Sequence, residues 1–275
     1  MRLGRWRTVV RVRTARQLCQ RRSYTSPFPY TSTPLHLTRN LLVRPIGNPV
    51  DPCSDNFVLY PNFFSKEECR EILLMALWKL DRADSSRRRK GRARAIAHEE
   101  HPDGLEGLQD LFTGEYEFET GHYDSVIHDY RETLMSSLPQ SVSPGLSSSL
   151  TRLYALVAPS ASQSSLPPAG TLTHLLHLAP SGQILPHVDN LEASGRLILG
   201  LSLGAERILR LQKGLEEGWD VRLPSGSVYV QNRDQIRYEY QHSILPYNHT
   251  DSVWDSHRLK PGHRISIMIR VSAFF

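Results

Sequence analysis

The sequence predicts an α+β protein, with helices in its first half and an all-β core in its second half. Two observations lead to this fold class. Apolar residues recur at helical spacing after residue 65, whereas from Thr171 onward apolar and polar residues alternate with the period of two that strands have. Gly, Pro and Asn turns separate at least six alternating runs, and short strands at such spacing are typical of a β-sandwich or barrel.

The best-marked helix follows a strand-like start, FVLYPNFF, at residues 57–64. Ser65 and Glu68 form an S-x-x-E capping box, in which each side chain satisfies the other residue's backbone N–H at a helix N-terminus. We expect this helix to pack against the β-rich core. Apolar residues then follow at three- and four-residue spacing: Ile72, Leu73, Ala76, Leu77 and Leu80.

Three stretches separate this helix from the β-rich half. Residues 116–138 (YEFETGHYDSVIHDYRETLMSSL) are expected to begin extended and to end in a helix. Residues 139–150 (PQSVSPGLSSSL) and 158–170 (APSASQSSLPPAG) are rich in Ser, Pro and Gly and are expected to be loops or an insertion. The runs expected to be strands are TLTHLLHLA, GRLILGLSLG, ERILRLQ, DVRLPSGSVYVQ, QIRYEYQHSI and HRISIMIRVSAFF.

The net charge of +5 is unevenly distributed along the chain. Residues 1–22 hold eight of the 33 Lys and Arg residues and no acid, so the remaining 25 stand against 28 Asp and Glu, a net −3. An Arg-rich, hydroxylated and acid-free start is typical of a mitochondrial transit peptide, which we expect at residues 1–24. A disordered basic tail that binds RNA is the alternative. Residues 25–55, rich in Pro, Ser and Thr, are expected to be an extended linker.

Cysteine usage and hydropathy argue against three classes of protein. The three cysteines, Cys19, Cys53 and Cys69, are isolated and form no C-x-x-C pair, so neither a disulfide framework nor a zinc cluster is expected. A reducing compartment such as the mitochondrial matrix agrees with this. No apolar run approaches the roughly 18 residues of a membrane-spanning helix.

The last alternating run, HRISIMIRVSAFF, has two different faces if it is a strand. Arg264, Ser266, Met268 and Arg270 share one face, and the other face is continuously apolar. The apolar face is expected to meet helices. The arginine face then lies either in water, as on an amphipathic edge strand, or inside an open barrel.

A candidate metal site follows from the triplet His187-x-Asp189 together with what comes after it, although such a triplet alone is more often a surface turn. Two His and one carboxylate on one face of an iron ion leave three positions open for a co-substrate and dioxygen. A dicarboxylate co-substrate also needs a cation for its distal carboxylate, and arginine binds a carboxylate through two parallel hydrogen bonds. His242 follows His187 by 55 residues and Arg264 follows 22 residues later. Residue types, order and strand placement thus agree with an iron site.

Several other histidines are weaker candidates as ligands. His249 and His257 fall in the stretch PYNHTDSVWDSHRLKPG, which is expected to be a loop, and His263 points away from the arginine face of its strand. His174 and His177 precede the triplet and are expected to pack or to support the site.

The charged stretch at residues 81–104 contains two features that could suggest a site. His98 and His101 lack the i,i+4 spacing of a helical zinc pair. The basic segment Arg87–Arg94 is most simply a solvated turn, and the alternative is a contact for an anionic substrate near the mouth of a site.

Three segments, ILPHVDN, RYEYQHSILP and GHRISIMIR, resemble the H-x-D, distal His and R-x-x-x-x-x-R segments of the AlkB-like Fe(II)/2-oxoglutarate-dependent dioxygenases. The resemblance is greatest to the mitochondrial AlkB homologue 7 subfamily, which FFSKEECREIL, HYDSVIHDYRET, LRLQ and SGSVYV also match. It extends from about residue 57 to 272. It implies a double-stranded β-helix (jelly-roll) core with N-terminal helices packed on one sheet, and one dioxygenase domain at residues 56–275.

The resemblance also implies the cofactors Fe(II), 2-oxoglutarate as co-substrate, and O2. Leu176 and Leu178 stand where many AlkB proteins carry an N-x-Y pair that binds the co-substrate, and this departure makes Tyr229 more important. A core tyrosine is the alternative role for Tyr229. The implied iron ligands are His187, Asp189 and His242, and the implied 2-oxoglutarate contacts are Arg264 at the distal carboxylate, Arg270 near the metal-chelating end, and Tyr229.

The resemblance implies that decarboxylation of 2-oxoglutarate to succinate drives oxidation of a substrate C–H bond, with no catalytic residue beyond the metal ligands. The substrate is a protein or a mitochondrial RNA, and a regulatory role in mitochondrial metabolism or programmed necrosis is also implied. A net charge of −3 outside the leader disfavours nucleic acid. The alternative function is a catalytically weak metal-binding module that acts through mitochondrial partners.

Overall fold

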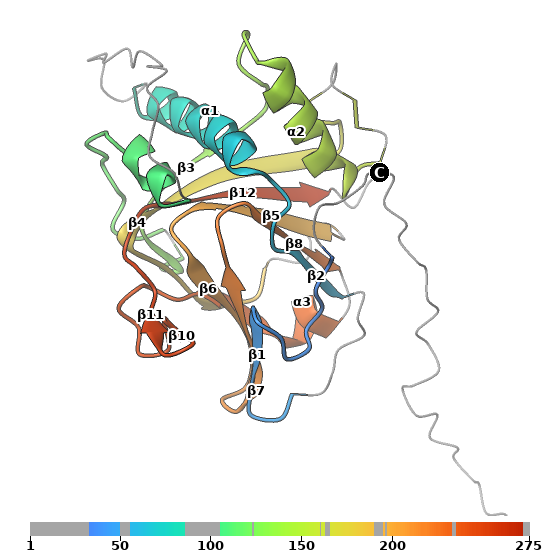
Figure 1. Ribbon diagram of the computed structural model, residues 1–275, viewed down its shortest axis with the longest axis vertical. Coiled ribbons are helices and arrows are strands. Elements are labelled where there is room, and N and C mark those ends of the chain that lie inside the picture. Colours follow the sequence, from blue (N-terminus) through green and yellow to red (C-terminus); the bar gives the residue numbers. More distant parts are fainter. Residues whose placement is uncertain are drawn as a thin grey trace, which may run out of the picture.

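The computed structural model describes residues 33–49, 56–85, 105–122, 124–159, 161–162, 166–189, 195, 197–232 and 235–271 (Figure 1). The predicted transit peptide, Cys19 and Cys53, and the basic segment Arg87–Arg94 with His98 and His101 lie outside the described residues.

Helices are concentrated early in the chain and strands late, as the sequence predicts. The helices are α1 (Lys66–Ser85), the 3₁₀ helix η2 (Leu105–Leu111), α2 (Pro144–Ala155) and α3 (Gln235–Glu239). The strands are β1 (Val43–Ile46), β2 (Phe57–Tyr60), β3 (Ile127–Leu134), β4 (Thr171–His187), β5 (Leu197–Gly204), β6 (Arg207–Lys213), β7 (Glu217–Leu223), β8 (Ser227–Asn232), β9 (Gln241–Ile244), β10 (Val253–Trp254), β11 (His257–Arg258) and β12 (Arg264–Val271).

The long strand β4 belongs to two layers of the molecule (Figure 1). Its first half, Thr171–Leu178, pairs with β12, and its last residues, Ile184 and His187, pair with β9. The pairing order β1-β7-β6-β9-β4-β12-β5-β8-β2, with β3 also on β4, therefore forms two facing antiparallel sheets. We call β3-β4-β12-β5-β8-β2 the large sheet and β4-β9-β6-β7-β1 the small sheet. This arrangement confirms the predicted jelly-roll.

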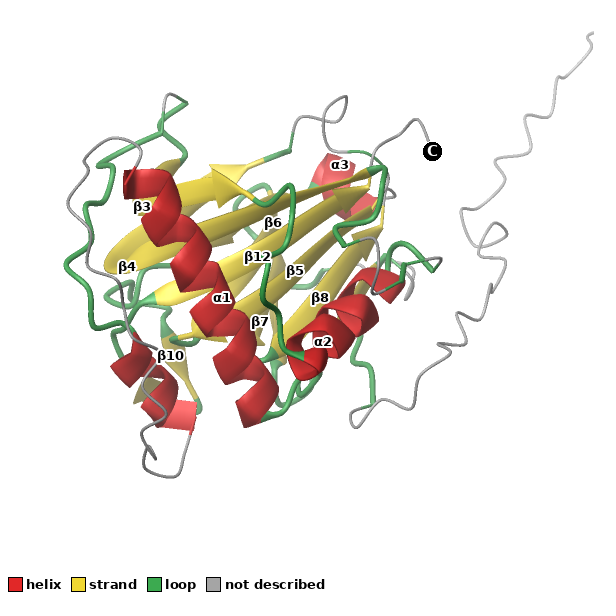
Figure 2. Ribbon diagram, turned by 90° about the horizontal axis from the view of Figure 1, so that it is seen from above, coloured by secondary structure: helices red, strands yellow, loops and turns green. Residues whose placement is uncertain are grey.

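The outer face of the large sheet is covered by α1 and α2, which cross its strands in Figure 2. The isoleucines of β12 lie fully buried beneath them, in one cluster with Leu73 and Leu150. The capping box begins α1 as predicted, because the Ser65 N–H donates to Glu68 Oε2 (2.9 Å) and the Glu68 N–H donates to Ser65 Oγ (3.3 Å). The prediction that N-terminal helices pack on one sheet is therefore confirmed.

A second apolar cluster fills the space between the two sheets. It joins Leu178 and Tyr229 of the large sheet to Leu209, Leu211 and Trp219 of the small sheet. The arginine face of β12 points into this interior, so Arg264 is only 1 % exposed. The arginine face of β12 therefore lies in the barrel interior and not in water.

Three predicted elements are wrong. The helix expected at the end of 116–138 is the strand β3, because Ile127–Leu134 pairs along β4. The loop expected at 139–150 contains α2, which starts at the cap Ser143, with Pro144 in its first turn and buried leucines on one side. The strand expected at 235–244 begins with the short helix α3 and becomes extended only at Gln241.

Part of the segment expected to be a linker contributes to the fold. Strand β1 pairs antiparallel with β7, and Leu35 forms a bridge to Leu59 of β2. Leu37 and Val43 are buried in the interior cluster. Within the described residues, none of the helices combines the length and hydropathy that crossing a membrane requires.

Candidate metal centre

The pairing of β4 with β9 brings two of the predicted ligands together. His187 and His242 are register partners across these antiparallel strands, and their ring centroids lie 4.0 Å apart. Asp189 comes two residues after His187, just past the end of β4, so strand alternation turns its side chain to the same side. The short H-x-D segment therefore presents both side chains to His242.

The three side chains form a compact group of ligand atoms. One ligand atom each from His187, Asp189 and His242 lies within 4.8 Å of the others. Asp189 Oδ2 is 4.0 Å from His242 Nε2. Two imidazoles and one carboxylate on one side of a metal are the arrangement that non-haem Fe(II) oxygenases use. Among the described residues, no other group of three such side chains comes this close.

Hydrogen bonding and burial prepare both imidazoles for a metal. His187 Nδ1 lies 2.9 Å from the Leu185 carbonyl oxygen, and a proton donated there leaves the lone pair of Nε2 available. Burial lowers the pKa of His242 to about 4, against the smaller opposite effect of Asp189, so its ring is neutral at pH 7. A metal binds the neutral imidazole.

Two arginines hold the carboxylate of Asp189. Arg270 Nη2 is 3.4 Å from Oδ1, and Arg237 Nη2 is 3.9 Å from Oδ2. Arg237 lies on α3 and also donates from Nη1 to the Gly195 carbonyl oxygen (2.8 Å). No pattern in the sequence points to Arg237, because QIRYEYQHSI looks like one continuous strand.

Arg264 is buried with most of its guanidinium unsatisfied. Its Nε donates to Ser202 Oγ (3.0 Å), whereas Nη1 and Nη2 have no hydrogen-bond partner in the part of the chain that the structure describes. Burial lowers its pKa. An unpaired guanidinium in a protein interior is strongly unfavourable. A carboxylate would accept both remaining donors side by side, so these residues fit a bound dicarboxylate.

Tyr229 projects from β8 into the same interior and is 6 % exposed. Its ring stacks on Phe57, with centroids 6.0 Å apart, and lies so close over Gly200 that a Cβ there would be 2.2 Å from Cζ. Burial raises the pKa of Tyr229, Asp189 adds to this, and the positive charges of Arg264 and Arg270 oppose it. The three predicted co-substrate contacts therefore share one interior with the metal group.

The two leucines at the positions of the N-x-Y pair also face this interior. Leu176 is opposite Ser266 of β12, and Leu178 is opposite Arg264. Both are buried, at 3 % and 0 % exposure. They pack beside the arginine and offer it no hydrogen bond.

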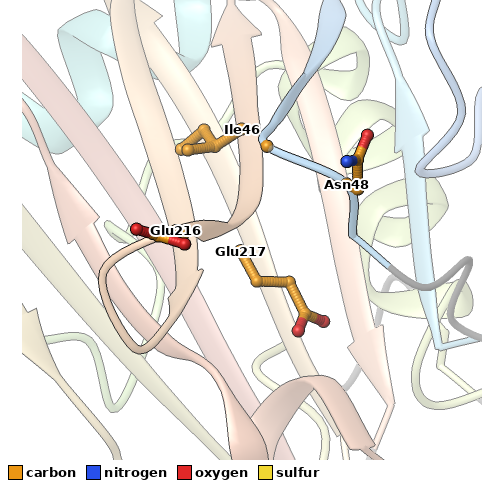
Figure 3. A pocket seen from close by; sticks show the side chains of 5 residues that line it. Ile46, Asn48, Glu216 and Glu217 are labelled. Atoms are coloured by element: carbon orange, nitrogen blue, oxygen red, sulfur yellow. The ribbon is translucent and has the colours of Figure 1, made fainter.

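His174 lies on the inner face of β4 opposite Met268, where burial and the charge of Arg270 lower its pKa to about 4, whereas His177, His249, His257 and His263 lie apart from the metal group. His263 points to the helix side of the large sheet, where His177 Nε2 is 3.1 Å from its Nδ1 and Phe112 stacks on its ring. His249 lies before the β10–β11 hairpin and His257 on it. A shallow hollow shown in Figure 3 is also separate from the predicted site residues, since Ile46, Gly47, Asn48, Glu216 and Glu217 line it.

A jelly-roll that holds two imidazoles, one carboxylate and an arginine between its sheets defines a class of iron-dependent oxygenases. Residues 56–270 match the family model of the 2OG-Fe(II) oxygenase superfamily, and the match includes all six predicted site residues. The chain belongs to this superfamily. The cofactor set of this superfamily is Fe(II), 2-oxoglutarate and O2, as predicted.

Two curated relatives are similar in sequence. Proteins of Bos taurus and Mus musculus, both named "Alpha-ketoglutarate-dependent dioxygenase alkB homolog 7, mitochondrial", are each 34 % identical over 155 residues. The similar region covers 56 % of this chain and 65 % of each relative, slightly less than two thirds of the relative's length.

Solved structures of oxygenases are similar at a lower level. A protein titled OsALKBH1 has a TM-score of 0.41 and 16 % identity, covering 78 % of this chain and 96 % of that one. A prolyl-4-hydroxylase of Pseudomonas putida has a TM-score of 0.41 and 11 % identity, covering 79 % and 92 %. A viral collagen prolyl hydroxylase from Paramecium Bursaria Chlorella virus-1 has a TM-score of 0.42 and 12 % identity, covering 78 % and 96 %.

Proposed function

We propose that this oxygenase acts in the mitochondrial matrix and oxidises a C–H bond of a protein or RNA substrate. The observation that carries the proposal is the buried guanidinium of Arg264, which has two unpaired nitrogens in the same interior as the His187, Asp189 and His242 group. A mitochondrial location is supported by the names of the two curated relatives and by the Arg-rich residues 1–24.

In this proposal the imidazoles of His187 and His242 and the carboxylate of Asp189 would hold the iron, which is the ligand set of non-haem Fe(II) oxygenases. Bound iron supplies dioxygen activation, coupled to the decarboxylation of 2-oxoglutarate to succinate and CO2. Arg264 holds the distal carboxylate of 2-oxoglutarate through Nη1 and Nη2. Arg270 orients Asp189 from 3.4 Å and lies near the metal-chelating end of the co-substrate.

The remaining interior residues orient the co-substrate and exclude water. Tyr229 contacts it from β8, and the charges of Arg264 and Arg270 both act on the Tyr229 phenol. Leu176 and Leu178 lie on β4, the strand next to β12, and their side chains make this part of the interior apolar. An apolar wall favours direct contact between Arg264 and the co-substrate, because water is kept from the guanidinium.

The alternative, a catalytically weak metal-binding module, makes a different prediction for the isolated protein. A dioxygenase turns over 2-oxoglutarate slowly even without its substrate, and succinate formation then requires Fe(II), O2 and the three ligands. A module binds iron and forms no succinate. The variant His187→Ala/Asp189→Ala should form none in either case. If this variant still bound iron and consumed 2-oxoglutarate normally, the assignment of the ligands would be wrong.

The substrate class is tested by mass spectrometry of mitochondrial RNA and mitochondrial proteins, with and without the active protein. A hydroxyl group found only with the wild type, or a methyl group that accumulates only where His187→Ala/Asp189→Ala replaces it, identifies the substrate. A change confined to RNA or to protein decides between the two classes. A regulatory role in mitochondrial metabolism or programmed necrosis is part of the same proposal. If it is correct, cells that carry His187→Ala/Asp189→Ala in place of the wild type should show altered metabolism or altered necrosis.

A further inference from the structure

Glu132 of the edge strand β3 lies on the face of the large sheet that is turned to the interior of the jelly-roll. Tyr130, two residues earlier, is buried in the interior cluster, so alternation puts Glu132 and Leu134 on the same inner face. Their register partners on β4 are Leu176 and His174. The site ligand His187 stands at the end of the same strand, where β4 pairs with β9 of the small sheet.

No described residue donates a hydrogen bond to the Glu132 carboxylate. The nearest cationic partner is His122, whose Nε2 lies 3.9 Å from Oε1, too far for a hydrogen bond. The side chain is 36 % exposed, and burial raises its pKa while the charges of His122 and Arg270 lower it. Arg270 is also the arginine that contacts Asp189, which places Glu132 in the electrostatic field of the metal centre.

Beyond Glu132 on the same inner face, three aliphatic side chains lie around His174. Leu134 and Leu172 are 55 % and 45 % exposed at the ends of β3 and β4. Met268 of β12 is half-buried beside them, opposite His174. We call Leu134, Leu172 and Met268 the aliphatic shelf. Because Leu134 and Leu172 are exposed on this face, they are available to a hydrocarbon group of a ligand.

The charge around Glu132 disfavours a polyanion. Glu119 and Asp124 lie close enough for their negative charges to raise the pKa of Glu132 further. A phosphate backbone would be repelled here, whereas a cation would be attracted. A half-buried carboxylate without a donor is stabilised by a ligand that brings an N–H.

We propose that Glu132 and the aliphatic shelf form a subsite for an aliphatic ammonium group on the substrate, as on a lysine side chain. The ammonium donates to the Glu132 carboxylate, and the hydrocarbon stem lies on Leu134, Leu172 and Met268. This inference rests on the proposed function and selects its protein substrate class. Charge complementarity with the carboxylate and the apolar character of the shelf favour this occupant over a nucleobase.

The experiment uses Mn(II) in place of iron, because its unpaired electrons enhance the relaxation of protons on nearby ligands. Full-length protein with Mn(II) is first titrated with 2-oxoglutarate, and the relaxation of its methylene protons reports on the metal site. The probes n-butylammonium, 1-butanol and butyrate then share one hydrocarbon stem and differ in charge. The relaxation enhancement should be about fivefold larger for butylammonium than for butanol, because a partly exposed ion pair contributes up to about 1 kcal/mol. It should be smallest for butyrate, whose charge Glu132 repels.

Two variants of Glu132 test the carboxylate itself. Glu132→Gln should reduce the butylammonium enhancement to the level of butanol, and Glu132→Lys should make butyrate the preferred probe. Glu216→Gln removes the same charge from the exposed β6–β7 turn and should change nothing. Each variant is compared with the wild type for 2-oxoglutarate relaxation, which a misfolded chain would lose.

The outcomes separate the subsite from the metal centre. If 2-oxoglutarate is relaxed but butanol equals butylammonium, or Glu132→Gln has no effect, the ammonium subsite is refuted and the proposed function stands. If 1-methyladenosine competes better than butylammonium, the subsite recognises a nucleobase and the inference is wrong. If 2-oxoglutarate itself shows no metal-dependent relaxation, the proposed function fails and this inference falls with it.

Discussion

His187 and His242 are register partners on β4 and β9, and their ring centroids lie 4.0 Å apart. Backbone pairing therefore sets the spacing of the two imidazoles. The Leu185 carbonyl oxygen fixes one ring, and burial keeps the other neutral. A site that the sheets assemble in advance does not have to order its ligands when the metal arrives.

Removing any one of the three ligands should abolish metal binding with little damage to the fold. Asp189→Ala and His242→Ala each leave two metal ligands. Loss of a residue that only orients a ligand lowers metal affinity by about 10- to 100-fold, so loss of a ligand should lower it by at least about 100-fold. Titration calorimetry with Co(II) or Mn(II) measures this. His257→Ala, on the exposed strand β11, is the matched control and should bind as the wild type does. Wild-type affinity in Asp189→Ala would rule out the site.

Arg264→Met should weaken 2-oxoglutarate binding without destabilising the apo protein. The variant loses two charge-assisted hydrogen bonds to 2-oxoglutarate. The binding free energy should weaken by about 3 kcal/mol, which corresponds to a KM for 2-oxoglutarate about 100-fold higher. The apo melting temperature should stay the same or rise, because an unpaired buried guanidinium is replaced by an apolar chain of similar length. Differential scanning fluorimetry with and without 2-oxoglutarate checks both effects. A large fall in the apo melting temperature would mean that Arg264 has a structural role.

Most of the candidate site could be predicted because its residues lie on strands. A period of two places Arg264 and Arg270 on one face, and the H-x-D spacing turns two side chains the same way. Arg237 could not be found by this reasoning. It reaches Asp189 from α3, in a run of residues whose alternation imitates a strand. Ser202, which holds Arg264 Nε, is likewise one serine among many until the register is known.

The errors in the fold arise where tertiary contacts outweigh local pattern. The residues of β3 are polar and look helical, but an edge strand needs only one partner, and β4 provides it over most of its length. The run SPGLSSSL looks like a loop by composition. Ser147 and Ser148, however, stand on the less buried side of α2, while Leu146 and Leu150 are buried against the core. Composition does not reveal this, because it ignores which residues recur every three or four positions.

Stability should fall as the pH drops below about 6.5, because buried histidines cannot be protonated in the folded state. Arg131 Nε donates to His177 Nδ1 (2.9 Å). Burial, with Arg131 and His263 adding to it, lowers the pKa of His177 to about 2. The unfolded chain binds a proton at a pKa of about 6.5, so the unfolding free energy falls by about 1.4 kcal/mol per pH unit for this histidine.

Urea denaturation at pH 7, 6 and 5 measures this slope. Residue 177 in His177→Gln takes up no proton in either state. The unfolding free energy of this variant should therefore depend on pH less steeply than that of the wild type. Between pH 6 and 5 the difference corresponds to the uptake of up to one proton on unfolding. His257→Gln removes an exposed ring and should leave the slope unchanged. An identical slope in His177→Gln would show that the folded protein already accommodates a proton at His177.

Tyr229→Phe separates a contact with the co-substrate from a purely structural tyrosine. The phenyl ring keeps its stacking on Phe57 and its place over Gly200, so only the hydroxyl is lost. If the hydroxyl binds 2-oxoglutarate, the KM for 2-oxoglutarate should rise about five-fold, as for one neutral hydrogen bond, with kcat at saturation unchanged. Tyr154→Phe is the control, because the Tyr154 hydroxyl lies 2.7 Å from Thr173 Oγ1 on the helix side of the same sheet. It should lower stability by about 1 kcal/mol and leave the KM unchanged. An unchanged KM in Tyr229→Phe would make Tyr229 a core residue, since its phenol would then act only through packing.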